Sequence, residues 1–120
     1  MKEGNAFDLE LFFSALADRT RLRLLNLMRG GEVCVCFFAE TLCTNNPKIS
    51  RHLAYLKRAG LVSARREGKW MHYKITEPQN LQAAGVFEST MNMIADDPQM
   101  QTDNLTLIQV CCPPMVQIDR

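Results

Sequence analysis

The chain lacks the hydrophobic segments that membrane and secreted proteins need. In its 120 residues, no apolar run approaches the about 20 residues of a membrane-spanning helix. Residues 1–5 also lack the apolar stretch of a secretory signal. These absences predict a cytoplasmic protein, in which the five cysteines are expected to be reduced thiols. The length fits one domain with a hydrophobic core of its own.

The chain also has little net charge, only +1, but its charges are unevenly distributed. Residues 47–75 carry eight basic side chains and one acidic side chain, a local charge of +7. Residues 76–120 carry one basic and six acidic side chains, a local charge of −5. Such a basic segment is typical of a surface that binds a polyanion. A solvated charged face is the alternative, and the one-sided excess favours the polyanion.

Hydrophobic spacing predicts a mainly α-helical fold with a small β-hairpin. We expect five helices, over residues 7–17, 19–29, about 36–43, 47–59 and about 79–95. Residues 62–75 alternate between apolar and polar side chains, which predicts a hairpin with its turn at 67–69. Residues 1–98 would form the domain. Residues 99–120 read as an irregular tail that carries Cys111 and Cys112, with the alternative of a strand at 105–110.

The fourth helix has the clearest boundaries. Asn46 is the expected N-cap, Pro47 suits the first helical position, and Gly60 supplies a left-handed stop. Two short helices, a tight turn, a basic helix and a basic hairpin together predict a winged helix-turn-helix. A helix of this kind fits the major groove of double-stranded DNA, and the hairpin contacts phosphates. The candidate DNA-binding residues are Lys48, Ser50, Arg51, His52, Tyr55, Arg58, Arg65, Arg66 and Lys69.

The two histidines and the last predicted helix have further expected roles. His52 flanks the apolar face of its helix and His72 lies in the hairpin, so packing or hydrogen bonding is expected of both histidines before metal binding. The 79–95 helix has an apolar stripe outside the DNA-reading unit, which makes it a natural dimer interface. Symmetric dimers bind two half-sites about one helical turn apart.

Four motifs in order resemble the ArsR/SmtB family of metalloregulatory repressors. They are the segments at residues 14–25, 32–36, 47–53 and 67–73, and the similarity covers roughly residues 11–76. The resemblance implies a homodimeric winged-helix repressor that binds its operator when ligand-free and dissociates when metallated. The Cys34-Val35-Cys36 version resembles the branch that responds to arsenite and antimonite.

Cys34 and Cys36 are therefore the expected metal ligands, and the helix N-terminus that follows favours their thiolate forms. The resemblance implies a third cysteine three residues after Cys36, but Ala39 occupies that position. Cys43 is a poor substitute, because a helix separates it from Cys36 by about 10 Å. A core position is more common for such a cysteine.

Three ways to complete the site stay open. Cys111 and Cys112 are further candidates that could reach back within one subunit or across the dimer. A small exogenous thiol could add the third sulfur. Alternatively, the inducer needs only two thiolates, as methylarsenite would.

Other functions remain as alternatives. The same fold could sense cadmium, lead or thiol oxidation. Zinc is disfavoured, because the resemblance implies that a zinc sensor of this family would use histidines and carboxylates of the last helix. Residues 79–95 contain no histidine and only Glu88 as an acidic residue. A thiol-based arsenate or disulfide reductase is less favoured, because the chain has no Cys-x-x-Cys pair and no acid or base group beside its thiols in sequence. A protein-binding module is disfavoured by the basic segment.

Overall fold

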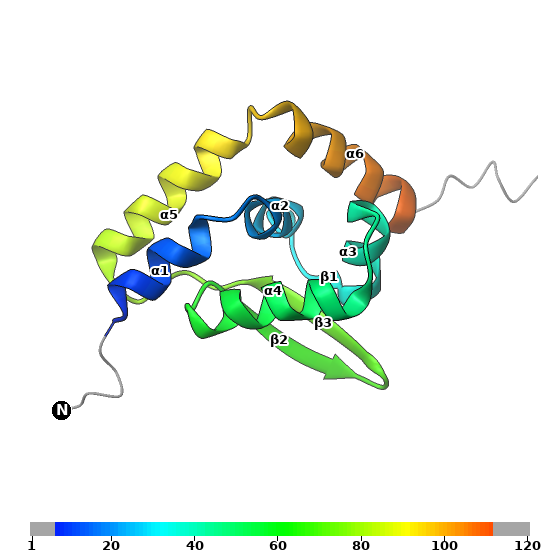
Figure 1. The fold of residues 1–120 in the computed structure, drawn as a ribbon, viewed down its shortest axis with the longest axis horizontal. Coiled ribbons are helices and arrows are strands. Elements are labelled where there is room, and N and C mark those ends of the chain that lie inside the picture. The colour runs from blue at the N-terminus through cyan, green and yellow to red at the C-terminus, as the bar shows by residue number, and fades with distance from the viewer. Residues whose placement is uncertain (1–6, 112–120) are drawn as a thin grey trace, which may run out of the picture.

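Helix α2 lies at the centre of the structure, and the other helices surround it (Figure 1). The computed structural model describes residues 7–111. In chain order the elements are α1 (Leu9–Leu16), α2 (Arg19–Leu27), β1 (Val33–Cys34), α3 (Val35–Leu42), α4 (Asn46–Arg58), β2 (Val62–Glu67), β3 (Trp70–Ile75), α5 (Leu81–Ile94) and α6 (Pro98–Cys111). The mainly helical winged helix-turn-helix predicted from the sequence is confirmed, with one helix more than expected in this part of the chain. None of the helices in residues 7–111 has the length and apolar character of a membrane-spanning segment.

Polar side chains cap the starts of α1, α2, α4 and α5. Asp18 accepts a hydrogen bond from the backbone N–H of Arg21, as its position predicts. For α4 the expected N-cap was wrong by one residue. Asn45, with extended backbone, accepts from the N–H of Lys48 at 2.9 Å, and Asn46 is the first helical residue. Two adjacent asparagines offer the same capping chemistry, so sequence alone does not choose between them.

Left-handed residues end the two helices of the helix-turn-helix. Gly60 has φ +81° after α4, and the N–H of Leu61 donates to the carbonyl of Leu56, which confirms the predicted stop. After α3 the left-handed position is held by Cys43, at φ +56°. Among the described residues it is the one non-glycine residue with positive φ. A glycine position is therefore occupied here by a residue with a side chain.

The sheet has three strands in the order β1-β3-β2. Strands β2 and β3 form the predicted antiparallel hairpin, which we call the wing. Strand β1 was not predicted. Its two residues pair with β3 in the register Val33↔Tyr73 and Cys34↔His72. The first of the two site cysteines is therefore part of the same sheet as the wing.

The core forms where α2, α4 and the surrounding helices meet. The side chains predicted for the inner face of α4, Ile49, Leu53 and Leu56, are fully buried. The other fully buried large apolar side chains are Phe12, Leu24, Leu25, Met28, Phe38, Leu61 and Met100. Since α4 buries this face, its opposite face stays available to solvent.

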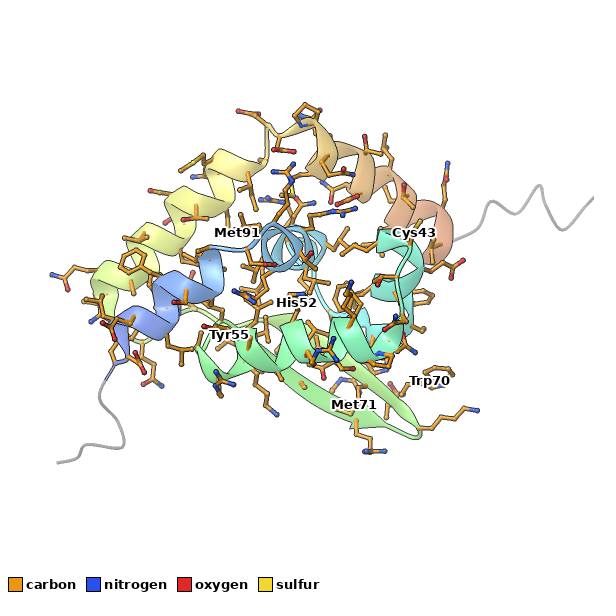
Figure 2. The ribbon with its side chains drawn as sticks, in the orientation of Figure 1. Cys43, His52, Tyr55, Trp70, Met71 and Met91 are labelled. Carbon is orange, nitrogen blue, oxygen red and sulfur yellow. The ribbon has the colours of Figure 1, made fainter. Side chains whose placement is uncertain are left out.

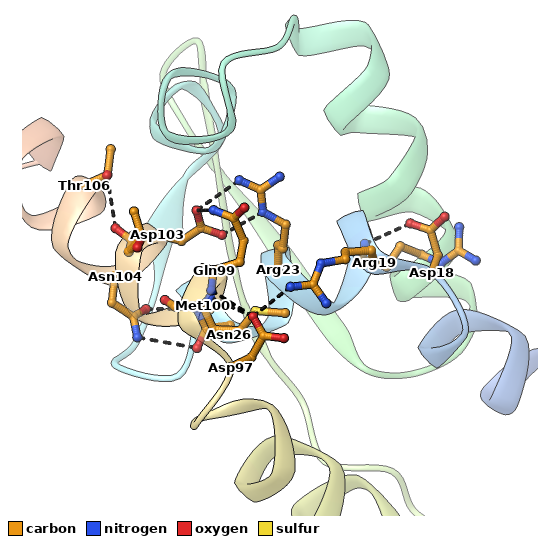
Figure 3. A network of polar contacts seen from close by, with 12 residues as sticks. Asp18, Arg19, Arg23, Asn26, Asp97, Gln99, Met100, Asp103, Asn104 and Thr106 are labelled. Carbon is orange, nitrogen blue, oxygen red and sulfur yellow. Dashed lines mark hydrogen bonds and ion pairs between the residues drawn. The ribbon is translucent and has the colours of Figure 1, made fainter.

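Residues 98–111 form a helix, so the expected irregular tail, with its alternative strand at 105–110, was wrong over this range. Helix α6 packs against α2 and α3. Arg23 donates two hydrogen bonds to the carboxylate of Asp103, at 2.7 and 2.9 Å (Figure 3). The side-chain amide of Asn26 donates to the carbonyl of Met100. These partners lie more than 70 residues apart in sequence, so no local pattern announces them.

Candidate nucleic-acid interface and thiol pair

Helix α4 presents a basic surface to solvent. It follows α3 after a short turn at residues 43–45, and the two helices form the helix-turn-helix. Of the predicted DNA-binding residues on α4, Lys48, Ser50, Arg51 and Arg58 are exposed. Lys57, which the sequence analysis did not include, is exposed as well. The N-terminal part of α4 can therefore offer cations and a hydroxyl to a groove, as recognition helices do.

Tyr55 and His52 are half-buried and contact Arg21 of α2. The Arg21 guanidinium carbon lies 4.1 Å from the centre of the Tyr55 ring, and that of Arg58 lies 4.9 Å from it. His52 lies between α4 and α2 (Figure 2), and its Nδ1 is 3.3 Å from Nη1 of Arg21. Asp18 Oδ2 is 3.8 Å from Nδ1 of His52. The hydrogen-bonding role expected of His52 is thus what the structure shows.

The surroundings of His52 favour its neutral form. Burial lowers the pKa of the imidazole, and the positive charges of Arg21, Arg51 and Lys48 lower it further against the opposite effect of Asp18. Because Arg21 has only donors, Nδ1 acts as the acceptor and the proton of the neutral ring is placed on Nε2. His52 is therefore a polar contact between α4 and α2.

The wing also presents basic side chains. Arg65, Arg66 and Lys69 are exposed, as predicted for phosphate contacts. Arg65 is already held by carboxylates, because it donates to both oxygens of Glu32, at 2.7 and 2.8 Å. This bidentate pair lowers the pKa of Glu32. Lys69 lies over the ring of Trp70, with its nitrogen 5.4 Å from the ring centre.

The two site cysteines lie together where β1 passes into α3. Cys36 Sγ donates to Cys34 Sγ at 3.4 Å. That distance exceeds the about 2.05 Å of a disulfide, so the residues are thiols. Cys34 is buried and occupies the N-cap of α3, whereas Cys36 is half-buried in its first turn. Metal–thiolate bonds are about 2.3 Å long, so one soft ion can reach both sulfurs.

The described residues do not supply the third ligand that the sequence leaves open. Within 7–111, no cluster of three or more histidine, cysteine or acidic side chains is arranged to hold a metal ion. Ala39 occupies the third position, half-buried. Cys43 is exposed at the other end of α3 (Figure 2), so the core position expected for it was wrong. The side chain of Cys111 and all of Cys112 lie outside the described residues.

Two residues near these sites were missed by the sequence analysis. Arg21 connects α2 to the recognition helix, and Glu32 connects the segment before the thiols to the wing. Both lie inside motifs that had been recognised, at residues 14–25 and 32–36. The signal available was therefore their place in those motifs, but the partners of each charge become visible only in the fold.

Comparisons with known proteins agree with this architecture. The model of the bacterial regulatory protein arsR family matches residues 18–64. The "Arsenical resistance operon repressor" of Escherichia coli is 38% identical over 94 residues, which cover 78% of this chain and 80% of that protein. The "Arsenic resistance transcriptional regulator ArsR1" of Pseudomonas putida is 40% identical over 92 residues, 72% of either chain.

Solved structures show the same fold. A homodimeric winged helix-turn-helix DNA-binding domain from Mycobacterium bovis, described as a possible ArsR-family transcriptional regulator, is 34% identical, with a TM-score of 0.59. The match covers 74% of this chain and 79% of that domain. HlyU from Vibrio cholerae has a TM-score of 0.63 and covers 80% of this chain, but at 24% identity it supports the fold alone. The chain belongs to the ArsR family of bacterial regulatory proteins, a family of transcription regulators and not of enzymes.

Proposed function

We propose that this regulator is a homodimeric repressor that releases operator DNA when trivalent arsenic or antimony binds Cys34 and Cys36. The observation that carries the proposal is the 3.4 Å separation of the two sulfurs at the start of α3. Two relatives at about 40% identity are named for arsenic resistance, which supports the same class of inducer. Arsenite, antimonite and methylarsenite are the candidate inducers, and none of them is a permanent cofactor.

Operator binding rests on the exposed face of α4 and on the wing. Arg51 has the bidentate geometry that reads guanine edges in the major groove, and Ser50 can donate or accept there. Lys48 and Arg58 suit phosphates. Arg66 and Lys69 at the wing add cations whose contribution falls as salt concentration rises. Tyr55 and His52 act through the orientation of α4, because both are in contact with Arg21.

Dimerisation would use helices α1 and α5. Both expose large apolar side chains, which are Leu9 and Phe13 on α1 and Leu81, Val86 and Met93 on α5. Large side chains of this kind on one molecule are typical of an interface between copies. The related Mycobacterium bovis domain is homodimeric, which supports this assignment. Two copies would present two α4 helices to successive major grooves.

The ligand would act at the junction of a strand and a helix. Cys34 ends β1 and Cys36 lies in the first turn of α3, so an ion on both sulfurs fixes the backbone between them. Helix α3 leads directly into the turn that carries α4. A changed start of α3 therefore moves the recognition helix relative to the dimer interface. By linkage, the ligand weakens DNA binding by as much as DNA weakens ligand binding, typically about 1–3 kcal/mol.

The proposal is tested by fluorescence anisotropy of the reduced protein on its own upstream DNA. Arsenite and methylarsenite are titrated in separate series. Release by arsenite indicates a third thiolate, and the next variants are Cys111→Ser and Cys112→Ser. Release by methylarsenite alone indicates that the two thiols form the whole site. A complex that neither compound dissociates contradicts the assignment of arsenic as the inducer. If cadmium releases the DNA at far lower concentration than arsenite does, the protein is a cation sensor instead.

A further inference from the structure

We infer that the wing is a second route by which a ligand on Cys34 and Cys36 reaches the DNA, and that Glu32 and Arg65 are the positioning residues of this route. The inference rests on the proposed function and adds to it. In the simpler mechanism the signal passes through α3 alone. Here it also passes through the three-stranded sheet, because β1 connects the thiol pair to the hairpin.

The first observation is the register of the sheet. Cys34 pairs with His72, and His72 pairs with Arg65 on the other side. Directly paired residues of antiparallel strands place their side chains on the same face of a sheet. Cys34, His72 and Arg65 therefore form one row across β1, β3 and β2. A displacement of Cys34 toward α3 would therefore displace His72 and Arg65, its neighbours in this row, before other residues of the sheet.

The second observation is the set of polar contacts at the same place. Glu32 precedes β1 by one residue and accepts from Arg65 Nε and Nη2, at 2.7 and 2.8 Å. Arg65 also donates to Glu67 at 3.2 Å, and Nε2 of His72 lies 3.4 Å from the same Glu67 oxygen. Glu67 is the last residue of β2 before the turn. A continuous chain of charged contacts thus runs from the segment before the thiols to the tip of the wing.

The geometry of the Glu32–Arg65 pair suits a positional role. Exposed ion pairs contribute little to stability, usually below about 1 kcal/mol. A bidentate pair, however, restricts the relative orientation of the two segments that it joins. Only one residue, Val33, separates Glu32 from Cys34. A ligand that changes the backbone at Cys34 therefore either carries the wing with it or breaks the pair.

The pair also couples to DNA binding through charge. Arg65 is a candidate for contact with a DNA phosphate. When DNA binds, its guanidinium must exchange the Glu32 carboxylate for a phosphate or contact both anions at once. Replacing Glu32 by glutamine removes the competing charge. We expect the operator affinity of ligand-free protein to be unchanged or up to about fivefold higher, since Arg65 then has its charge free for a phosphate.

Trp70 offers a direct reporter of the wing. It is the only tryptophan of the chain, it is the first residue of β3, and 46% of its surface is exposed. Figure 2 shows it at the end of the hairpin, next to Met71. Its emission depends on its local surroundings, including the Lys69 ammonium over its ring. Movement of the wing is therefore measurable without any added label and without DNA.

The experiment titrates the reduced full-length protein with methylarsenite while Trp70 emission is recorded, with calorimetry of the same titration in parallel. In the wild type we expect the emission change to saturate at the calorimetric stoichiometry. In Glu32→Gln we expect binding within about threefold of wild type but at least half of the emission change lost. Ligand-induced operator release should weaken by a similar proportion. Glu40→Gln, which removes a charge from the exposed surface of α3, is the matched control and should behave as wild type.

The possible failures are distinguishable. Calorimetric binding without any change in Trp70 emission overturns the inference and leaves the proposed function standing. An emission change of full size in Glu32→Gln also overturns the inference, because the pair would then carry no signal. If methylarsenite does not bind the wild type, both titrations are repeated with arsenite. Absence of calorimetric binding of both compounds overturns the proposed function, and the inference with it.

Discussion

Arg21 of α2 and His52 of α4 form a contact between these two helices. Nη1 of Arg21 lies 3.3 Å from Nδ1 of His52, while its Nε and Nη2 donate to the carbonyls of Ala15 and Ser14 at the end of α1. The same guanidinium stacks on Tyr55. One side chain of α2 therefore holds both α1, a proposed dimer helix, and α4, the recognition helix.

His52 makes the stability of the protein dependent on pH. Because its pKa is lowered on folding, the unfolded chain binds its proton more readily than the folded chain. The stabilising effect of a neutral His52 is fully present above the unfolded value of about 6.5 and is lost as pH falls through the folded value. We expect His52→Gln to lose less stability than wild type between pH 7.5 and pH 5.5. Urea denaturation at both values measures the difference, and equal losses in the two proteins contradict this role.

Cys43 occupies a left-handed position that glycine adopts without strain. Replacing it by glycine is expected to raise the free energy of unfolding by up to about 1 kcal/mol, because a residue with a Cβ is strained there. Cys43→Ser keeps the Cβ and serves as the control, with little expected change. A gain of equal size in both variants would show that the thiol, and not the backbone, was responsible.

Asp103 fixes α6 to α2. Its carboxylate is buried and accepts both hydrogen bonds of Arg23. We expect Asp103→Asn to lower the free energy of unfolding by about 3 kcal/mol, because the Arg23 charge loses its partner in a largely buried place. Asp96→Asn, at an exposed position between α5 and α6, is the control and should stay within about 0.5 kcal/mol of wild type. Equal effects of the two variants would mean that α6 is not held by this pair.

Lys48 and Arg51 should differ in how they contribute to operator binding. Lys48→Gln is expected to weaken binding to operator and unrelated DNA alike. It should also reduce the slope of the logarithm of the binding constant against the logarithm of salt concentration by about one. Arg51→Gln should instead reduce the preference for operator over unrelated DNA, at a cost of about 1–3 kcal/mol in discrimination. Anisotropy titrations at several salt concentrations measure both. An unchanged preference in Arg51→Gln would remove it from base recognition.

The sequence was sufficient for elements that have strong local signals. The helix α4 has an apolar face at Ile49, Leu53 and Leu56 and a glycine stop, and the wing has alternating residues around Gly68. Each of these patterns reports directly on burial or on a backbone conformation, so the structure agrees with it. The proximity of Cys34 and Cys36 was predictable for the same reason, since two residues separated by one position cannot lie far apart.

Long-range partners explain what the sequence did not predict. The buried face of α6 includes Asp103, which a pattern of apolar residues does not reveal, and its partner Arg23 lies 80 residues away. Strand β1 has two residues, too few for a periodic signal, and exists because β3 offers it a free edge. The contact of Glu32 with Arg65 spans 33 residues and depends on the same sheet. These features required the tertiary structure.

The most direct test of the account measures ligand-induced release of operator DNA from the Cys34→Ser/Cys36→Ser variant. Anisotropy of the DNA complex is followed during titration with arsenite and methylarsenite, beside wild type and the Cys43→Ser control. We predict that the double variant binds operator with wild-type affinity and stays bound at every ligand concentration, while Cys43→Ser is released like wild type. Release of the double variant at wild-type ligand concentrations would contradict the assignment of the sensor to the thiol pair.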